Sequence, residues 1–82
     1  MPTEYYMICN SNRHIIAIHR VRDSARAYFD RMCLREDCFP VVYISVMRVD
    51  DHGKVLSETL IRSYDKVVDT YGDYNLDITH VD

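Results

Sequence analysis

The chain has 82 residues, a formal net charge of -3 and a hydrophobic content of 48%. This length suits one domain and excludes two, and the hydrophobic content argues against a wholly disordered chain. A membrane-spanning helix needs about 20 apolar residues, whereas the apolar runs here are only a few residues long, so we expect no transmembrane segment. We also expect no secretory signal, because the start MPTEYYMICN lacks a basic stretch followed by an apolar one.

The first predicted elements are two strands. Residues 4–9 are aromatic and apolar, residues 10–13 are turn formers, and residues 14–21 are rich in β-branched side chains. This pattern predicts a hairpin with a four-residue loop. Both faces of 14–21 carry apolar side chains, which predicts an inner position in the sheet.

A helix is predicted next, over residues 24–36, with Asp23 or Ser24 as its N-cap. Ala25, Phe29 and Met32 form one apolar stripe at helical spacing, and Tyr28 and Cys33 flank it. This stripe is expected to pack on the sheet. On its polar surface, Asp30 follows Arg26 by four residues, so an intrahelical ion pair is available. Pro40 marks the end of the helical region.

A second hairpin is predicted from residues 41–50 and 54–62, joined by a turn at Gly53. A helical alternative over residues 55–64 is weaker because of that turn. We then expect a short helix from Tyr64 to Tyr71, capped by Ser63 and stopped by Gly72. The alternating pattern of residues 76–81 predicts an edge strand at the end of the chain.

These elements predict a single α+β domain over residues 1–82, with an antiparallel sheet of four to five strands (ββαββ) and one main helix on a face. Open sheet edges favour pairing with another chain, so a homodimer is compatible with this fold.

Cysteine and histidine give no catalytic or metal-binding pattern. The three cysteines, Cys9, Cys33 and Cys38, form an odd set without metal-ligand spacing, and we expect reduced thiols in a cytoplasmic protein. Cys9 and Cys33 fall in apolar positions and are expected to lie in the core. The four histidines are scattered. We expect no metal and no cofactor.

Pro2 directly precedes the first predicted strand. In this feature, and loosely in the strand at residues 43–46, the chain resembles tautomerase-superfamily enzymes. That resemblance implies a general base at an N-terminal Pro2 and a keto–enol substrate. The family order of strand, helix and strand differs from the order here, because the strand at residues 14–21 intervenes. The alternative is that Pro2 is simply a terminal residue.

Arginines on and beside the predicted helix offer a nucleic-acid-binding alternative, with Arg22, Arg26, Arg31 and Arg35 as contacts to phosphate. Arg20 precedes them, and seven tyrosines could stack on bases. Nucleic-acid-binding proteins usually carry an excess of basic residues, whereas this chain is acidic with a pI near 5.7. We therefore expect no direct nucleic-acid binding and a solvated helix surface instead.

The negative charge is concentrated at the end of the chain. Residues 1–62 carry nine basic and eight acidic side chains, whereas residues 63–82 carry five aspartates and one lysine. Four of these aspartates recur every four residues, and tyrosines lie between them. Tyrosine supplies rigid apolar contact area and carboxylates steer a basic partner. The predicted partner-binding residues are Asp65, Asp69, Tyr71, Asp73, Tyr74 and Asp77. The alternative is a soluble, partly frayed tail.

With two hairpins around a helix, few glycines and an acidic, tyrosine-bearing end, the chain resembles small bacteriophage-encoded proteins that block host machinery, anti-CRISPR proteins among them. The resemblance lies in size, charge and architecture. It implies a non-enzymatic inhibitor that binds a host defence complex and occludes its nucleic-acid or partner surface. The expected partner is thus a protein with a basic, nucleic-acid-binding surface, and no membrane is involved.

Overall fold

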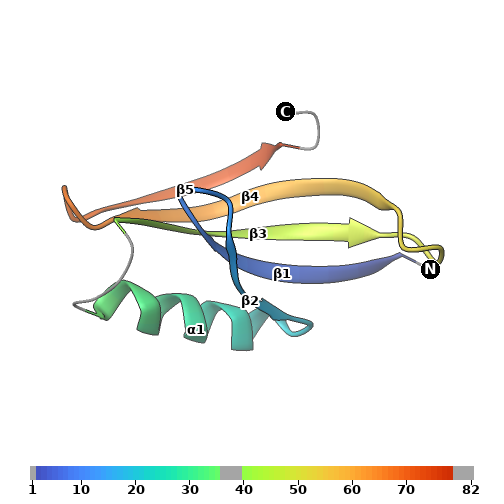
Figure 1. The fold of residues 1–82 in the computed structure, drawn as a ribbon, viewed down its shortest axis with the longest axis horizontal. Coiled ribbons are helices and arrows are strands. Elements are labelled where there is room, and N and C mark those ends of the chain that lie inside the picture. Colours follow the sequence, from blue (N-terminus) through green and yellow to red (C-terminus); the bar gives the residue numbers. More distant parts are fainter. Residues whose placement is uncertain (1, 36–39, 79–82) are drawn as a thin grey trace.

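The computed structural model describes residues 2–35 and 40–78, and it shows a five-stranded antiparallel sheet with one helix packed on it (Figure 1). The elements are β1 (Thr3–Asn10), β2 (Ile15–His19), α1 (Arg22–Leu34), β3 (Val41–Val49), β4 (Val55–Asp65) and β5 (Thr70–Asp77). Their order across the sheet is β2-β1-β3-β4-β5. The predicted α+β architecture, with hairpins on both sides of one helix in the chain, is confirmed. Within the described residues, no helix is long and apolar enough to cross a membrane.

The first hairpin forms as predicted, because Asn10 organises its loop. The Asn10 side-chain oxygen accepts hydrogen bonds from the backbone N–H groups of Asn12 at 2.9 Å and His14 at 3.0 Å. The inner position predicted for the second strand is wrong. β2 lies at the edge of the sheet, and its Ile15 and Ile18 are about half exposed. The apolar residues on both faces of β2 therefore do not indicate an inner strand, because some of them stay exposed at the sheet edge.

Helix α1 buries the predicted stripe, since Ala25, Phe29, Met32 and Cys33 are all buried. These side chains pack against Ile8 of β1, Val42 and Ile44 of β3, and Tyr64 of β4. The helix begins at Arg22, and its N-cap is Val21 without a side-chain cap, so the prediction of Asp23 or Ser24 as the cap is wrong. It ends at Leu34, two residues earlier than predicted. Cys38 and residues 79–81 lie outside the described residues.

The second hairpin turns at Asp50. Its side-chain oxygen accepts hydrogen bonds from the backbone N–H groups of His52 and Lys54, both at 2.9 Å. Gly53 adopts a φ of 84°, a left-handed conformation that favours glycine. β4 then runs to Asp65 without helical structure, so the helical alternative for residues 55–64 is wrong.

The short helix predicted from Tyr64 to Tyr71 is also wrong. Tyr64 is a buried β4 residue opposite Val42 of β3, and the chain turns at residues 66–69 to return as β5. The predicted edge strand therefore begins earlier, at Thr70. Asp69 makes this turn with a φ of 51°. Gly72 does not stop a helix; it lies within β5 opposite Ser63.

The helix covers only part of the sheet. α1 contacts β1, β2 and β3, whereas β5 forms the sheet edge opposite β2 (Figure 1). Buried apolar side chains gather under the helix, whereas seven of the eight β5 residues are exposed. This unequal cover leaves two surfaces that carry chemistry: the β4–β5 hairpin and the groove between it and α1.

Candidate functional site

The predicted acidic residues lie on the outermost hairpin, which we call the acidic arm and define as residues 65–77. Its described aspartates outnumber its single lysine by four to one. The arm also exposes large apolar side chains, namely Val67, Val68, Tyr71, Tyr74 and Leu76. Exposed apolar and aromatic groups on an edge strand are typical of a contact surface.

The aspartates do not form one stripe. The Asp65 side chain accepts a hydrogen bond from the backbone N–H of Val67 at 3.0 Å, and Asp69 accepts one from the Tyr64 hydroxyl at 2.7 Å. Both lie at the turn. Asp73 and Asp77 lie further along β5, where Asp73 pairs with Arg62. Two of the aspartates thus stabilise the turn of the arm, and a third is paired with a neighbouring strand.

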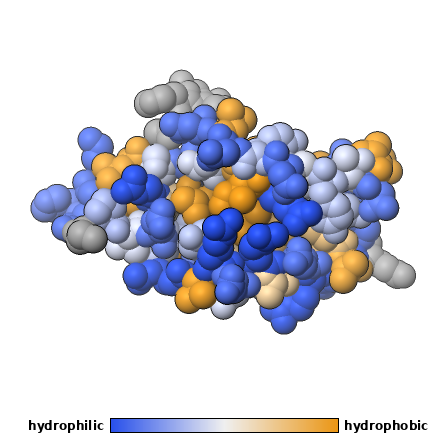
Figure 2. All heavy atoms as spheres, turned by 180° about the vertical axis from the view of Figure 1, so that it is seen from behind, coloured by the Kyte–Doolittle hydropathy of each residue, from blue (hydrophilic) through white to orange (hydrophobic). Residues whose placement is uncertain are grey.

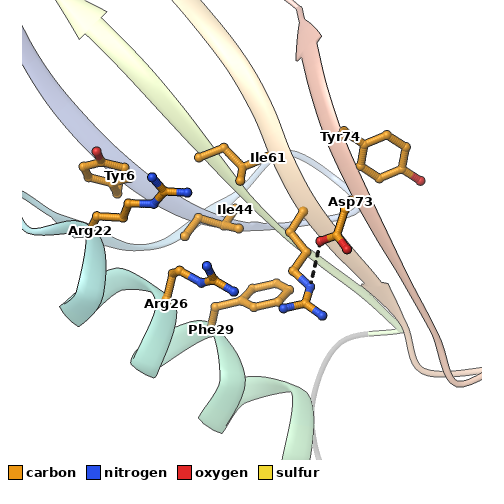
Figure 3. A pocket seen from close by; sticks show the side chains of 9 residues that line it. Tyr6, Arg22, Arg26, Phe29, Ile44, Ile61, Asp73 and Tyr74 are labelled. Atoms are coloured by element: carbon orange, nitrogen blue, oxygen red, sulfur yellow. Dashed lines mark ion pairs between the residues drawn. The ribbon is translucent and has the colours of Figure 1, made fainter.

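The two predicted tyrosines point in different directions. Tyr71 lies opposite Tyr64 with ring centroids 4.5 Å apart, and the Arg62 guanidinium lies 4.7 Å from the Tyr71 ring centroid. Tyr74 points away from the helix side of the arm (Figure 3), and a Cβ added to Gly72 would come within 2.7 Å of its ring. Tyr71 and Asp73 therefore share one face of the arm, and the Tyr74 ring points away from that face.

A hydrogen bond at the base of the arm changes the pKa of the buried Tyr64. The hydrogen bond to Asp69, together with burial and the Asp69 charge, raises the pKa of Tyr64 to about 12. Burial and the neighbouring Cys33 raise the pKa of Tyr71. Lys66 donates hydrogen bonds to the carbonyl groups of Arg35 and Pro40, through its side chain and its backbone N–H respectively. The turn of the arm is thus fixed to the C-terminal end of α1.

A groove of about 160 Å³ separates α1 from the arm (Figure 3). We call it the arginine groove. Three arginines line it together with two arm residues and an apolar floor: Arg22, Arg26, Arg62, Asp73, Tyr74, Tyr6, Phe29, Ile44 and Ile61. Seen from behind in Figure 2, apolar side chains lie in the middle of the molecule and strongly hydrophilic ones border them.

The arginines of this groove are poorly neutralised. Arg22 and Arg26 extend from α1 toward the strands (Figure 3), and neither forms an ion pair with a carboxylate of residues 2–35 or 40–78. The predicted pair of Arg26 with Asp30 is thus not formed. Arg62 lies 3.2 Å from Asp73 through its buried Nε atom, which nevertheless lacks a well-directed hydrogen bond. Three guanidinium groups therefore face one carboxylate.

The groove continues past Tyr6, Arg22, Ile61 and Tyr74 into a wider, more open depression of about 440 Å³. The depression adds polar side chains to the lining, namely Glu4, Arg48, Thr59 and Asn75. Hydrogen-bond donors and acceptors thus lie beside the arginines.

The sequence missed Arg62, Ile61 and Tyr6 as groove residues. The one available signal was Arg62, a charged residue directly after the apolar pair Leu60 and Ile61. The register of β3 with β4 shifts between Ile44 and Ser45, and this irregularity lets Ile61 and Arg62 both reach the groove. Conversely, Arg31 lies over the Tyr28 ring at 5.8 Å, so it does not line the groove with Arg22 and Arg26.

The sheet face away from the helix holds a polar cluster beside an apolar depression, which is lined by Val41, Tyr43, Leu60 and Ile78 among others. Glu58 accepts hydrogen bonds from the Ser45 hydroxyl at 3.2 Å and from Arg13 at 3.3 Å. Burial raises the pKa of the Cys9 thiol, despite a hydrogen bond with Tyr43. Cys9 and Cys33 are both buried, which confirms their predicted core positions. A raised pKa makes Cys9 a poor nucleophile at neutral pH.

The positions of Pro2 and of the metal-ligating side chains bear on two further hypotheses. Pro2 is exposed before β1 and lines none of the grooves above. Strand β2 separates β1 from α1 in the chain, which departs from the tautomerase order. No group of three or more metal-ligating side chains gathers among residues 2–35 and 40–78. No protein-family model, curated protein or solved structure matches this chain, so its function is inferred from these surfaces alone.

Proposed function

We propose that this protein is a non-enzymatic interaction protein that binds a partner protein through the acidic arm. The observation that carries the proposal is the exposure of Tyr71, Tyr74 and Leu76, between 43% and 52%, on an edge strand that also bears carboxylates. A strand with one unpaired edge offers backbone groups to a partner, and exposed tyrosines provide contact area.

The partner we propose has a basic surface. The described arm has four aspartates and one lysine, and the lysine is bonded to the end of α1. Carboxylates in this setting accelerate association with a positively charged surface and select against acidic ones. A nucleic-acid-binding surface of a host defence complex of the CRISPR type has this chemistry, and its occlusion would inhibit the complex by stoichiometric binding.

The test uses purified CRISPR effector complexes and the full chain. We expect at least one complex to bind the protein in a fixed stoichiometry and to lose binding of its target nucleic acid. Substitution of Tyr74→Ala with Leu76→Ser is expected to weaken binding at least about tenfold, because aromatic anchors dominate interface energies.

The matched control is Val55→Ser with Leu56→Ser. These two residues are also about half exposed, yet they lie at the far end of β4 from the turn of the arm. The control is expected to bind as the unmodified chain does. Equal binding by the arm variant would remove the arm as the contact surface, and failure of every complex to bind would remove the host-defence assignment.

A further inference from the structure

The arginine groove carries an excess of positive charge among the residues that line it. Three guanidinium groups and one carboxylate line it, a local balance of +2. Arg22 and Arg26 have no carboxylate partner in the described ranges, 2–35 and 40–78. Asp73 faces only the Nε side of Arg62. The groove therefore favours a ligand with two negative charges in a compact group.

A phosphate monoester fits this charge better than a carboxylate does. It carries about -1.5 to -2 at neutral pH and offers three acceptor oxygens, whereas a carboxylate carries one charge. Arginine forks pair with phosphate oxygens through two parallel hydrogen bonds. Arg22 and Arg26 lie one helical turn apart and extend in the same direction, so both can reach one group (Figure 3).

The remaining lining suits a flat heterocycle. Tyr6 and Ile61 line both the arginine groove and the wider depression, so an apolar surface connects the two. Thr59, Asn75 and Glu4 in the depression supply hydrogen-bond donors and acceptors beside this apolar surface. Small-molecule sites typically combine such apolar walls with a few polar groups that fix orientation.

We propose that the arginine groove and the adjoining depression bind a nucleoside 5′-monophosphate, with its phosphate on Arg22, Arg26 and Arg62 and its base against Tyr6 and Ile61. The same chemistry is present in a free nucleotide and at a 5′-phosphorylated end of a nucleic acid. This site is independent of the partner-binding role of the arm, although Asp73 and Tyr74 border both surfaces.

The first measurement is a calorimetric and NMR titration of the full chain with each of the four nucleoside 5′-monophosphates. We expect saturable binding, with chemical-shift changes at Tyr6, Arg26 and Ile61. The corresponding nucleosides, which lack the phosphate, are expected to bind at least about tenfold more weakly. A 5′-phosphorylated oligonucleotide, compared with its 5′-hydroxyl form, tells whether a nucleic-acid end is also accepted.

The variant test uses a double variant, in which Arg22→Gln and Arg26→Gln are combined. Its control is the single variant Arg31→Gln on the same helix. Arg22 and Arg26 are exposed, so α1 is expected to remain folded by circular dichroism. The double variant should lose at least about tenfold in nucleotide affinity, and Arg31→Gln should leave it unchanged.

Three results would overturn the proposal. These are the absence of saturable nucleotide binding, equal loss in the Arg31→Gln control, and tighter binding of an acidic or phosphotyrosine peptide than of any nucleotide. The single variant Leu76→Ser separates the two proposals, because Leu76 lines neither the groove nor the depression, whereas Tyr74 lines both. It should weaken partner binding and leave nucleotide affinity unchanged.

Discussion

The helix-covered part of the sheet and the acidic arm have opposite relations to solvent. Ile8, Val42 and Ile44, from β1 and β3, are between 0% and 2% exposed beneath α1, whereas Tyr71, Tyr74 and Leu76 of β5 are about half exposed. Both regions are antiparallel sheet with continuous pairing, apart from local register shifts. The difference in exposure between the two regions therefore comes from cover by the helix and not from a difference in strand pairing.

Stability and partner binding are therefore expected to depend on different parts of the sheet. Buried apolar area stabilises the fold by roughly 25 cal/mol per Å², whereas a side chain that stays exposed contributes little. The covered part is therefore expected to be sensitive to substitution. Substitutions in the arm should leave the stability of the free protein nearly unchanged, but they should weaken its binding to a partner.

The largest effect is expected for Phe29→Ala, at the centre of the covered part. Phe29 is 1% exposed and packs between α1 and β3, so its removal should lower the free energy of unfolding by about 3–5 kcal/mol. Urea denaturation measures this change. Leu34→Ser, on the same helix but exposed, should change it by less than about 0.5 kcal/mol. Similar losses for both variants would contradict the assigned role of the buried stripe.

The next effect is a loss of stability at alkaline pH that involves Tyr64, where the two parts meet. The pKa of Tyr64 is about 12 in the folded chain, above the ordinary value of 10. The unfolded chain therefore ionises first, so the stabilisation is complete below pH 10 and is lost as the pH rises toward 12. Burial raises the pKa of Tyr43 to about 12 as well, and it contributes in the same direction.

Tyr64→Phe is expected to make the free energy of unfolding less dependent on pH between 10 and 12, because one of the shifted hydroxyl groups is gone. Denaturation at a series of pH values measures this slope. Leu34→Ser, an exposed substitution that removes no ionisable group, is the control and should leave the slope unchanged. An unchanged slope in Tyr64→Phe would show that the Asp69 hydrogen bond does not stabilise the protonated hydroxyl.

A smaller effect is expected from the ion pair that links the arm to β4. Asp73 is 81% exposed, so solvent screens its attraction to Arg62. A double-mutant cycle of Asp73→Asn and Arg62→Gln should give a coupling energy of about 0.2–1 kcal/mol. A coupling well above 2 kcal/mol would mean that the pair locks the arm in place, and the arm would then belong to the stable part.

The smallest effect is expected for Leu76→Ser in the free protein. Leu76 is 52% exposed on β5, so the free energy of unfolding should change by less than about 0.5 kcal/mol. Thermal and urea denaturation measure it. A loss of 2 kcal/mol or more would show that Leu76 is needed for folding, and its exposure would no longer indicate a contact surface.

The fold was predictable where local patterns agree with tertiary structure. The α1 stripe, the Asn10 loop and the Gly53 turn each follow from local residue chemistry, and all three are observed. The region from Tyr64 to Tyr71 was not, because Ser63 as a cap and Gly72 as a stop predict a short helix there. Pairing of Tyr64 with Val42 and of Asp65 with Val41 outweighs that local pattern.

The surfaces were predictable only in part. The charge asymmetry of the sequence located the acidic arm, and the structure places its aspartates at one hairpin. Asp65 and Asp69 accept hydrogen bonds within the turn of the arm, and the spacing of aspartates in the sequence does not predict these bonds. The arginine groove joins Arg22 and Arg26 to Arg62, about forty residues later, and only the tertiary fold brings these together.

Amide hydrogen exchange on the free, full chain is the most direct test of the division between the covered part and the arm. We expect the amides of β1 and β3 to exchange only through global unfolding, with the free energy measured by denaturation. Those of β5 should exchange through local opening at a distinctly lower free energy. Equal protection of β5 and β1 would contradict the division and make the arm part of the stable core.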